Sequence, residues 1–104
     1  MKYMVELCVD AQTGNELEAK PGGPGPVIGR VLGRFKPEVV YMTTTERKIY
    51  MVVNLEDPAS VTELMIAGAK IAGSYPKFTP VIAGDDFGEV VGKALPAANA
   101  IVDG

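Results

Sequence analysis

The residue with the clearest chemical potential in this sequence is Glu6, a carboxylate in the middle of an alternating segment. Between Lys2 and Asp10, apolar side chains recur at every second position, as in a β-strand with one buried face. Glu6 falls on the other face, between Met4 and Cys8. A carboxylate among apolar neighbours is the setting in which proteins obtain a proton acceptor for general acid–base catalysis. Glu6 is therefore the candidate catalytic residue.

The alternative role for Glu6 is structural. In that case its carboxylate forms an ion pair across the sheet or across a subunit interface, with Arg47, Lys48 or Lys77 as the partner. Cys8 has no histidine and no helix N-terminus to activate it, so we expect a buried, inert thiol rather than a nucleophile.

Other side chains on the face of Glu6 could bind a ligand. Residues 48–55 repeat the alternation, which puts Tyr50, Val52 and Asn54 on this face. Tyrosine and asparagine orient polar groups of ligands by hydrogen bonds, but both are also common in plain subunit contacts. The candidate ligand-binding residues are Met4, Cys8, Tyr50, Val52, Asn54 and, from a later strand, Thr79.

The composition excludes several kinds of chemistry. The 104 residues include no histidine, which removes the usual neutral-pH base and most zinc and haem sites. Asp85 and Asp86 are adjacent carboxylates of the kind that caps a helix, and the prolines within residues 22–29 remove N–H groups that a phosphate loop needs. A net charge of −3 without a Lys/Arg cluster argues against nucleic-acid binding. We therefore expect no metal and no cofactor.

Regular segments must position these side chains. The pattern predicts a strand at residues 2–10, an amphipathic helix at 26–36, a hairpin of strands 38–44 and 48–55, a helix from Asp57 to about residue 72, and a strand at 77–83. A last short helix runs to Leu95, with Asp85 or Asp86 as its cap. Residues 11–25, rich in glycine and proline, are expected to form a flexible loop, and residues 96–104 a loose tail.

This order of elements predicts one α+β domain over residues 1–104, a ferredoxin-like βαββαβ unit with a C-terminal helix. Its antiparallel four-stranded sheet would place the fourth strand beside the first, then the third, then the second, with the helices on one face. Pro80 cannot donate to a sheet ladder, which agrees with an edge position for the fourth strand. The opposite face would be bare and mostly apolar, so we expect a second copy to cover it.

Three short motifs resemble the dimeric α+β barrel superfamily, and within it the small members of unknown function. They are Leu32-Gly33-Arg34-Phe35, Glu56-Asp57-Pro58-Ala59, and Phe78-Thr79-Pro80-Val81 followed by Asp85-Asp86. The superfamily includes cofactor-independent monooxygenases, muconolactone-isomerase-like enzymes and haem-degrading enzymes. The resemblance implies a homodimeric barrel. The chain lacks the histidine and tryptophan that those enzymes commonly use.

Two functions fit this sequence. The first is a homo-oligomer that binds a small, largely apolar or aromatic molecule; as an enzyme it would catalyse a cofactor-independent isomerisation or proton transfer, with Glu6 as base and Tyr50 and Asn54 as orienting groups. The second is a non-catalytic module whose apolar sheet face only assembles subunits or docks a partner. No apolar run reaches the roughly 18–20 residues of a membrane span, and no signal-peptide pattern begins the chain, so we expect a cytoplasmic protein.

Overall fold

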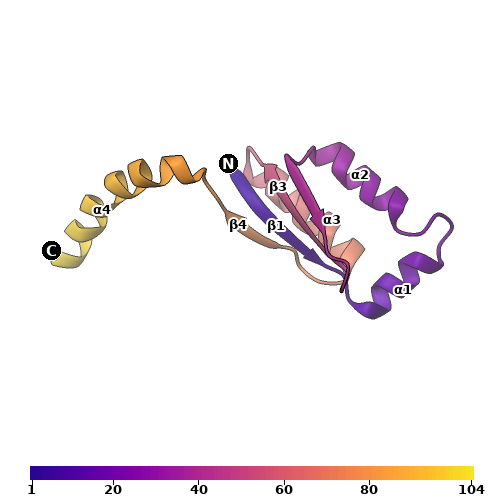
Figure 1. Ribbon diagram of the computed structural model, residues 1–104. Coiled ribbons are helices and arrows are strands. Elements are labelled where there is room, and N and C mark those ends of the chain that lie inside the picture. The colour runs from indigo at the N-terminus through magenta and orange to yellow at the C-terminus, as the bar shows by residue number, and fades with distance from the viewer.

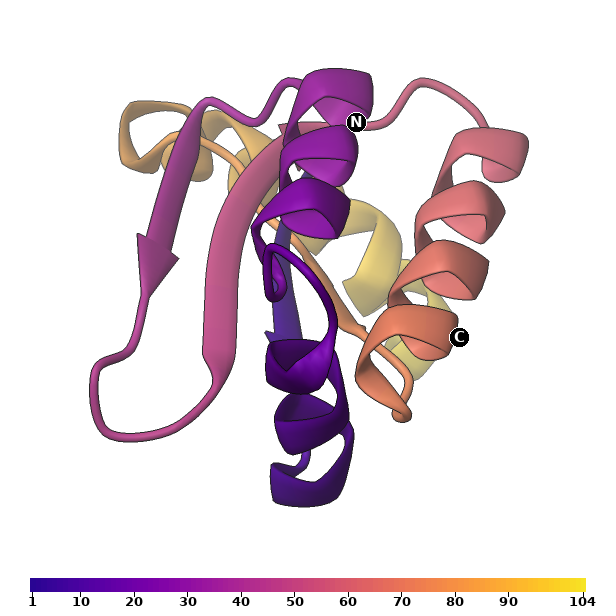
Figure 2. The ribbon, with the colours of Figure 1, turned by 90° about the vertical axis from the view of Figure 1, so that its right-hand side faces the viewer.

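The polypeptide forms one antiparallel sheet that is covered by helices on one side only (Figures 1 and 2). The computed structural model describes residues 1–104. Helices α1, α2 and α3 lie on one face, whereas α4 extends away on the other side of the sheet. The elements are β1 (Lys2–Cys8), α1 (Ala11–Ala19), α2 (Gly25–Phe35), β2 (Val39–Met42), β3 (Lys48–Asn54), α3 (Pro58–Ala72), β4 (Lys77–Pro80), the 3₁₀ turn η1 (Gly84–Asp86) and α4 (Phe87–Asp103).

The sheet has the order β2-β3-β1-β4, and every neighbouring pair is antiparallel. This is the order expected of a ferredoxin-like α+β fold, so the predicted fold class is confirmed. The edge position of β4 is confirmed as well, because β4 pairs with β1 alone and ends at Pro80, opposite Tyr3. No helix has the length and apolar character needed to cross a membrane.

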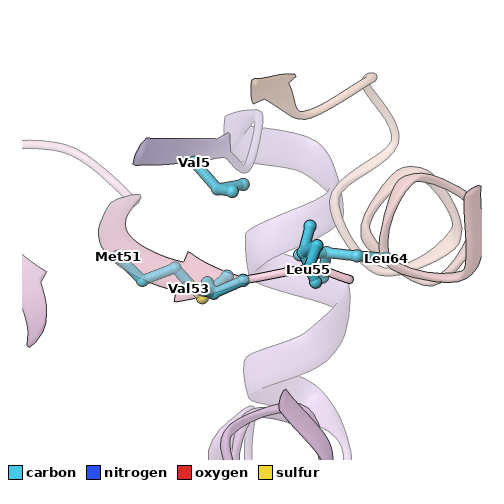
Figure 3. Close-up of a cluster of buried hydrophobic side chains, with 5 residues drawn as sticks. All are labelled: Val5, Met51, Val53, Leu55 and Leu64. Carbon is cyan, nitrogen blue, oxygen red and sulfur yellow. The ribbon is translucent and has the colours of Figure 1, made fainter. Parts of the chain in front are cut away.

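The core lies between the sheet and the helices, and the alternation in β1 and β3 decides its composition. Side chains at every second position of both strands point toward the helices and are buried, as predicted. Figure 3 shows the main cluster, in which Leu64 of α3 meets the side chains of the sheet. Its members are Val5, Met51, Val53, Leu55 and Leu64.

Helix α3 begins and ends where the sequence indicates. Asp57 is its N-cap, accepting hydrogen bonds from the backbone N–H and the hydroxyl of Ser60, each at 2.8 Å. Gly73 ends the helix in the left-handed conformation, with φ of 76°. Within the helix, a Cβ at Gly68 would lie 2.5 Å from Cγ of Pro76, so only glycine allows α3 to pack this closely.

The prediction that residues 11–25 lack regular structure is wrong for most of the segment. Residues 11–19 form α1, which Asp10 caps by accepting a 2.7 Å hydrogen bond from the backbone N–H of Thr13. The helix was missed because its sequence carries no apolar period and includes Gly14. Only the stretch from Lys20 to Pro24 is irregular, with positive φ at Gly22 and Gly23. Whether the segment is mobile stays a prediction.

The prediction of a loose tail at residues 96–104 is also wrong, because all of these residues except Gly104 are part of a helix. Helix α4 continues through Pro96 to Asp103, so proline interrupts one backbone hydrogen bond without ending the helix. The predicted strand at 77–83 is shorter and ends at Pro80. Asp86 occupies the N-cap position of α4, as predicted, but its side chain accepts no capping hydrogen bond.

Candidate functional site

The predicted site residues all lie on one face of the sheet, the bare face. We use the name bare face for the side of the sheet opposite α1, α2 and α3. In the register of the strands, Glu6 of β1 lies opposite Tyr50 of β3 and Lys77 of β4. Met4 lies in the same way between Val52 and Thr79. The two remaining predicted residues end the row: Asn54 lies opposite Lys2, and Cys8 opposite Lys48.

The ionisable groups on this face are engaged with one another. The Glu6 carboxylate lies 3.8 Å from the Nζ atom of Lys77, which is one of the ion-pair partners expected for a structural role. The hydroxyl of Tyr50, followed by the carboxylate of Glu46 at 3.5 Å, raises the pKa of Lys48 above its usual value. The ammonium group of Lys48 also lies 5.6 Å from the centre of the Tyr50 ring. Cys8 is exposed rather than buried, so that part of the prediction is wrong.

A partly enclosed apolar hollow lies on the opposite side of the sheet. It is a cavity of about 200 Å³ between the sheet and helices α1 and α2, and none of the seven predicted site residues lines it. Its walls are aliphatic side chains of all three elements. They include Leu17 of α1, Ile28, Val31 and Leu32 of α2, and Ile49 and Met51 of β3.

Arg47, at the rim of this cavity, holds α1 in place. Its guanidinium donates hydrogen bonds to the carbonyl of Ala11 at 3.1 Å and to Oδ1 of Asn15 at 2.9 Å, and it pairs with Glu18 at 3.0 Å. The arginine side chain lies directly on Gly14, where a Cβ atom would overlap its Cδ and Nε atoms. Thus one side chain from the hairpin connection contacts α1 at Ala11, Gly14, Asn15 and Glu18. The absence of a side chain at Gly14 leaves the space that Arg47 occupies.

The rest of the rim is charged, and its charges are paired. Glu18 pairs with Arg47, and Glu46 pairs with Lys48. The lining includes no histidine, serine, cysteine or tyrosine. The cavity can therefore hold an apolar group with a polar end at the rim.

Sequence analysis missed this cavity because its wall depends on α1. Leu17 and the neighbouring Glu18 lie in the segment expected to be a flexible loop, so they had no predicted partners. A usable signal was present in Asp10 and Thr13, the spacing of a helix N-cap. No three His, Cys, Asp or Glu side chains lie close enough together to bind a metal ion. No protein-family model and no curated protein matches the sequence.

Proposed function

We propose that the protein binds a small, largely apolar molecule in the cavity between the sheet and helices α1 and α2. The observation that carries this proposal is the aliphatic lining of a cavity of about 200 Å³ with a charged rim. An apolar cavity of roughly 150 Å³ is enough to bind benzene, so the volume suits one aromatic ring or a short branched chain. The ligand's polar end would lie near Arg47.

We propose further that the binding unit is a homo-oligomer, because the bare face exposes apolar side chains. Met4 and Val39 are about two-fifths exposed, and Tyr41 is 70% exposed. Burying a large apolar side chain contributes roughly 1.5–3 kcal/mol. A second copy of the chain that covers these residues would gain this free energy for each of them.

A second candidate function is proton transfer on the bare face. It is favoured by the strand register, which sets Glu6 beside Tyr50. With this face covered by a second copy, Glu6 would accept a proton and Tyr50 and Asn54 would orient the substrate, as in a cofactor-independent isomerase. If instead the ion pair of Glu6 with Lys77 is all that this face provides, the face serves only assembly.

Binding to the cavity is tested with benzene, phenol and benzoate as probes. We expect each to raise the thermal midpoint of the full-length protein, because a ligand that binds only the folded state stabilises it. Ile28→Phe places a ring inside the cavity and should abolish the shift for all three probes. Ile66→Phe makes the same change on the exposed side of α3 and should leave the shift intact.

Two results would contradict the cavity proposal. The first is no shift with any probe in the wild-type protein at saturating concentration. The second is an undiminished shift in Ile28→Phe, because binding would then lie elsewhere. For the second candidate, Glu6→Gln should remove any isomerase activity while the cavity shift remains.

A further inference from the structure

Helix α4 has no partner within its own chain. Beyond the adjoining turn η1 it makes no extensive contact, and none of its residues is buried. Figures 1 and 2 show it projecting from the end of β4 away from the sheet. The molecule is consequently elongated, with principal extents of 59 × 29 × 24 Å.

The sequence of α4 is nevertheless amphipathic, as in a helix that packs against a partner. At the helical spacing its large apolar side chains share one stripe, which we call the α4 stripe: Phe87, Val90, Val91, Leu95, Ile101 and Val102. Gly88, Gly92, Pro96 and Asn99 lie on the flanks and the back, together with the few charges. Glycine and proline oppose helix formation, and in proteins most of the stability of a helix comes from packing of its apolar face. Such a sequence needs a packing partner to stay helical.

The amount of exposed surface gives the size of that partner contact. A compact chain of 11.0 kDa would expose about 5,600 Å². This chain exposes 7173 Å². The excess of roughly 1,500 Å² is about twice the 800 Å² that each partner buries in a standard interface. The radius of gyration, 17.4 Å, also exceeds the roughly 13 Å of a compact domain of this length.

Exposed apolar surface, together with the charges around it, indicates which surface receives the helix. Residues 84–104 carry four carboxylates, Asp85, Asp86, Glu89 and Asp103, against one lysine, Lys93. By strand register, the bare face carries three lysines, Lys2, Lys48 and Lys77, and they form ion pairs with Glu38, Glu46 and Glu6. Membrane-surface helices usually bear Lys and Arg on their polar face, and α4 has the opposite balance. The bare face exposes the apolar side chains of Met4, Val39 and Tyr41, so it matches the α4 stripe in apolar character, and its lysines lie among them to meet the carboxylates of residues 84–104.

We propose that α4 is an exchanged arm: its stripe packs on the bare face of a second copy of the chain, whose own α4 packs back in the same way. The exchange is reciprocal, as in a dimer with two-fold symmetry, and it covers both unpartnered apolar surfaces at once. It rests on the homo-oligomer part of the proposed function and is independent of the cavity.

The test uses full-length protein in sedimentation equilibrium. Val91→Asp/Leu95→Asp puts two charges into the α4 stripe, and Asn99→Asp/Ala100→Asp puts the same charges on its back. We expect the dimer dissociation constant to rise about 100-fold or more in the stripe variant, because two buried apolar side chains become charged. We expect the control variant to change it by less than about threefold.

Two further readouts locate the arm. Dilution of the wild type below its dissociation constant should reduce the helical circular dichroism signal, because α4 melts when its partner leaves. Cys8, exposed on the bare face of the single chain, should react slowly with a thiol reagent in the wild-type dimer and lose this protection in the stripe variant.

The outcomes separate the exchanged arm from its alternatives. A stripe variant that dimerises as well as the control variant and still protects Cys8 would show that the sheets meet without α4. This result would contradict the exchange of α4 but not the homo-oligomer. A wild type that stays monomeric at about 50 μM contradicts both. A monomer that binds vesicles of phosphatidylglycerol through the stripe would make α4 a membrane-surface helix and overturn the arm.

Discussion

Arg47 is the residue on which the cavity wall most depends. It makes two hydrogen bonds and one ion pair to α1, whose own apolar surface is small. A hydrogen bond contributes about 0.5–1.5 kcal/mol net, and more when one partner is charged. The contacts form only when the hairpin connection and α1 are both in place, so the sequence pattern of neither segment predicts them.

We expect Arg47→Ala to lower the free energy of unfolding by about 1–2 kcal/mol, as measured by urea denaturation. The reason is that α1 loses the side chain that holds it to the hairpin. Arg30→Ala removes an arginine of α2 whose side chain forms no ion pair and no hydrogen bond, and it should change the free energy of unfolding little. Equal effects of the two substitutions would contradict the role assigned to Arg47.

Asp57 makes the stability of the protein depend on acid pH. The backbone N–H of Ser60, followed by its hydroxyl, holds the pKa of Asp57 below the ordinary value of 3.8. The folded state thus favours the charged carboxylate. Its contribution is fully present above the unfolded pKa near 3.8 and is lost as the pH falls through the lower folded pKa. The backbone N–H of Thr13, followed by its hydroxyl, lowers the pKa of Asp10 in the same way, so Asp10 adds to this acid dependence.

Asp57→Asn should flatten this acid dependence while keeping much of the neutral-pH stability, because asparagine also caps helices but does not titrate. The measurement is urea unfolding between about pH 2 and 5. Asp103→Asn, at the exposed end of α4, serves as the control. A steep acid dependence that persists unchanged in Asp57→Asn would contradict the assignment.

Among the elements, those with a local signal were predicted and those held by tertiary contacts were not. The alternation of β1 and β3, the cap of α3 and the proline of β4 each act within a few residues, so their positions follow from sequence. The predicted face of Glu6, Tyr50 and Asn54 follows for the same reason. Helix α1 has only the Asp10–Thr13 cap as a local signal and otherwise depends on Arg47, whereas the second half of α4 contains Pro96, which argues against a helix.

Helix α1 should open more readily than α3, because its buried surface consists of little more than Gly14. Native-state hydrogen exchange should therefore show lower protection for amides of α1 than for those around Leu64 in α3. Arg47→Ala should lower the protection of α1 selectively and speed cleavage at Glu16 and Glu18 by a Glu-specific protease. Equal protection of both helices would contradict this picture.

At the scale of the whole molecule, a single chain leaves much of its apolar surface without cover. Only 11 of 104 residues are buried, although 47% of residues are hydrophobic. The proposed second copy would cover this surface, and the stability of the folded state would then depend on protein concentration.

We expect the thermal midpoint to rise with protein concentration between about 1 and 100 μM, since the assembled state is the stable one. Differential scanning calorimetry measures this directly. The stripe variant Val91→Asp/Leu95→Asp should lose most of the dependence. A midpoint that does not move over this range in the wild type would argue against a reversible oligomer.

We propose that a ligand binds in the cavity between the sheet and helices α1 and α2 and not on the bare face. Methyl-resolved NMR of the full-length protein, titrated with benzoate, tests it most directly. We expect benzoate to change the chemical shifts of the methyl groups of Leu17, Ile28 and Val31 first. The methyl signals of Met4, Val52 and Thr79 should stay in place. Shifts confined to Met4, Val52 and Thr79, or no shifts at all, would contradict it.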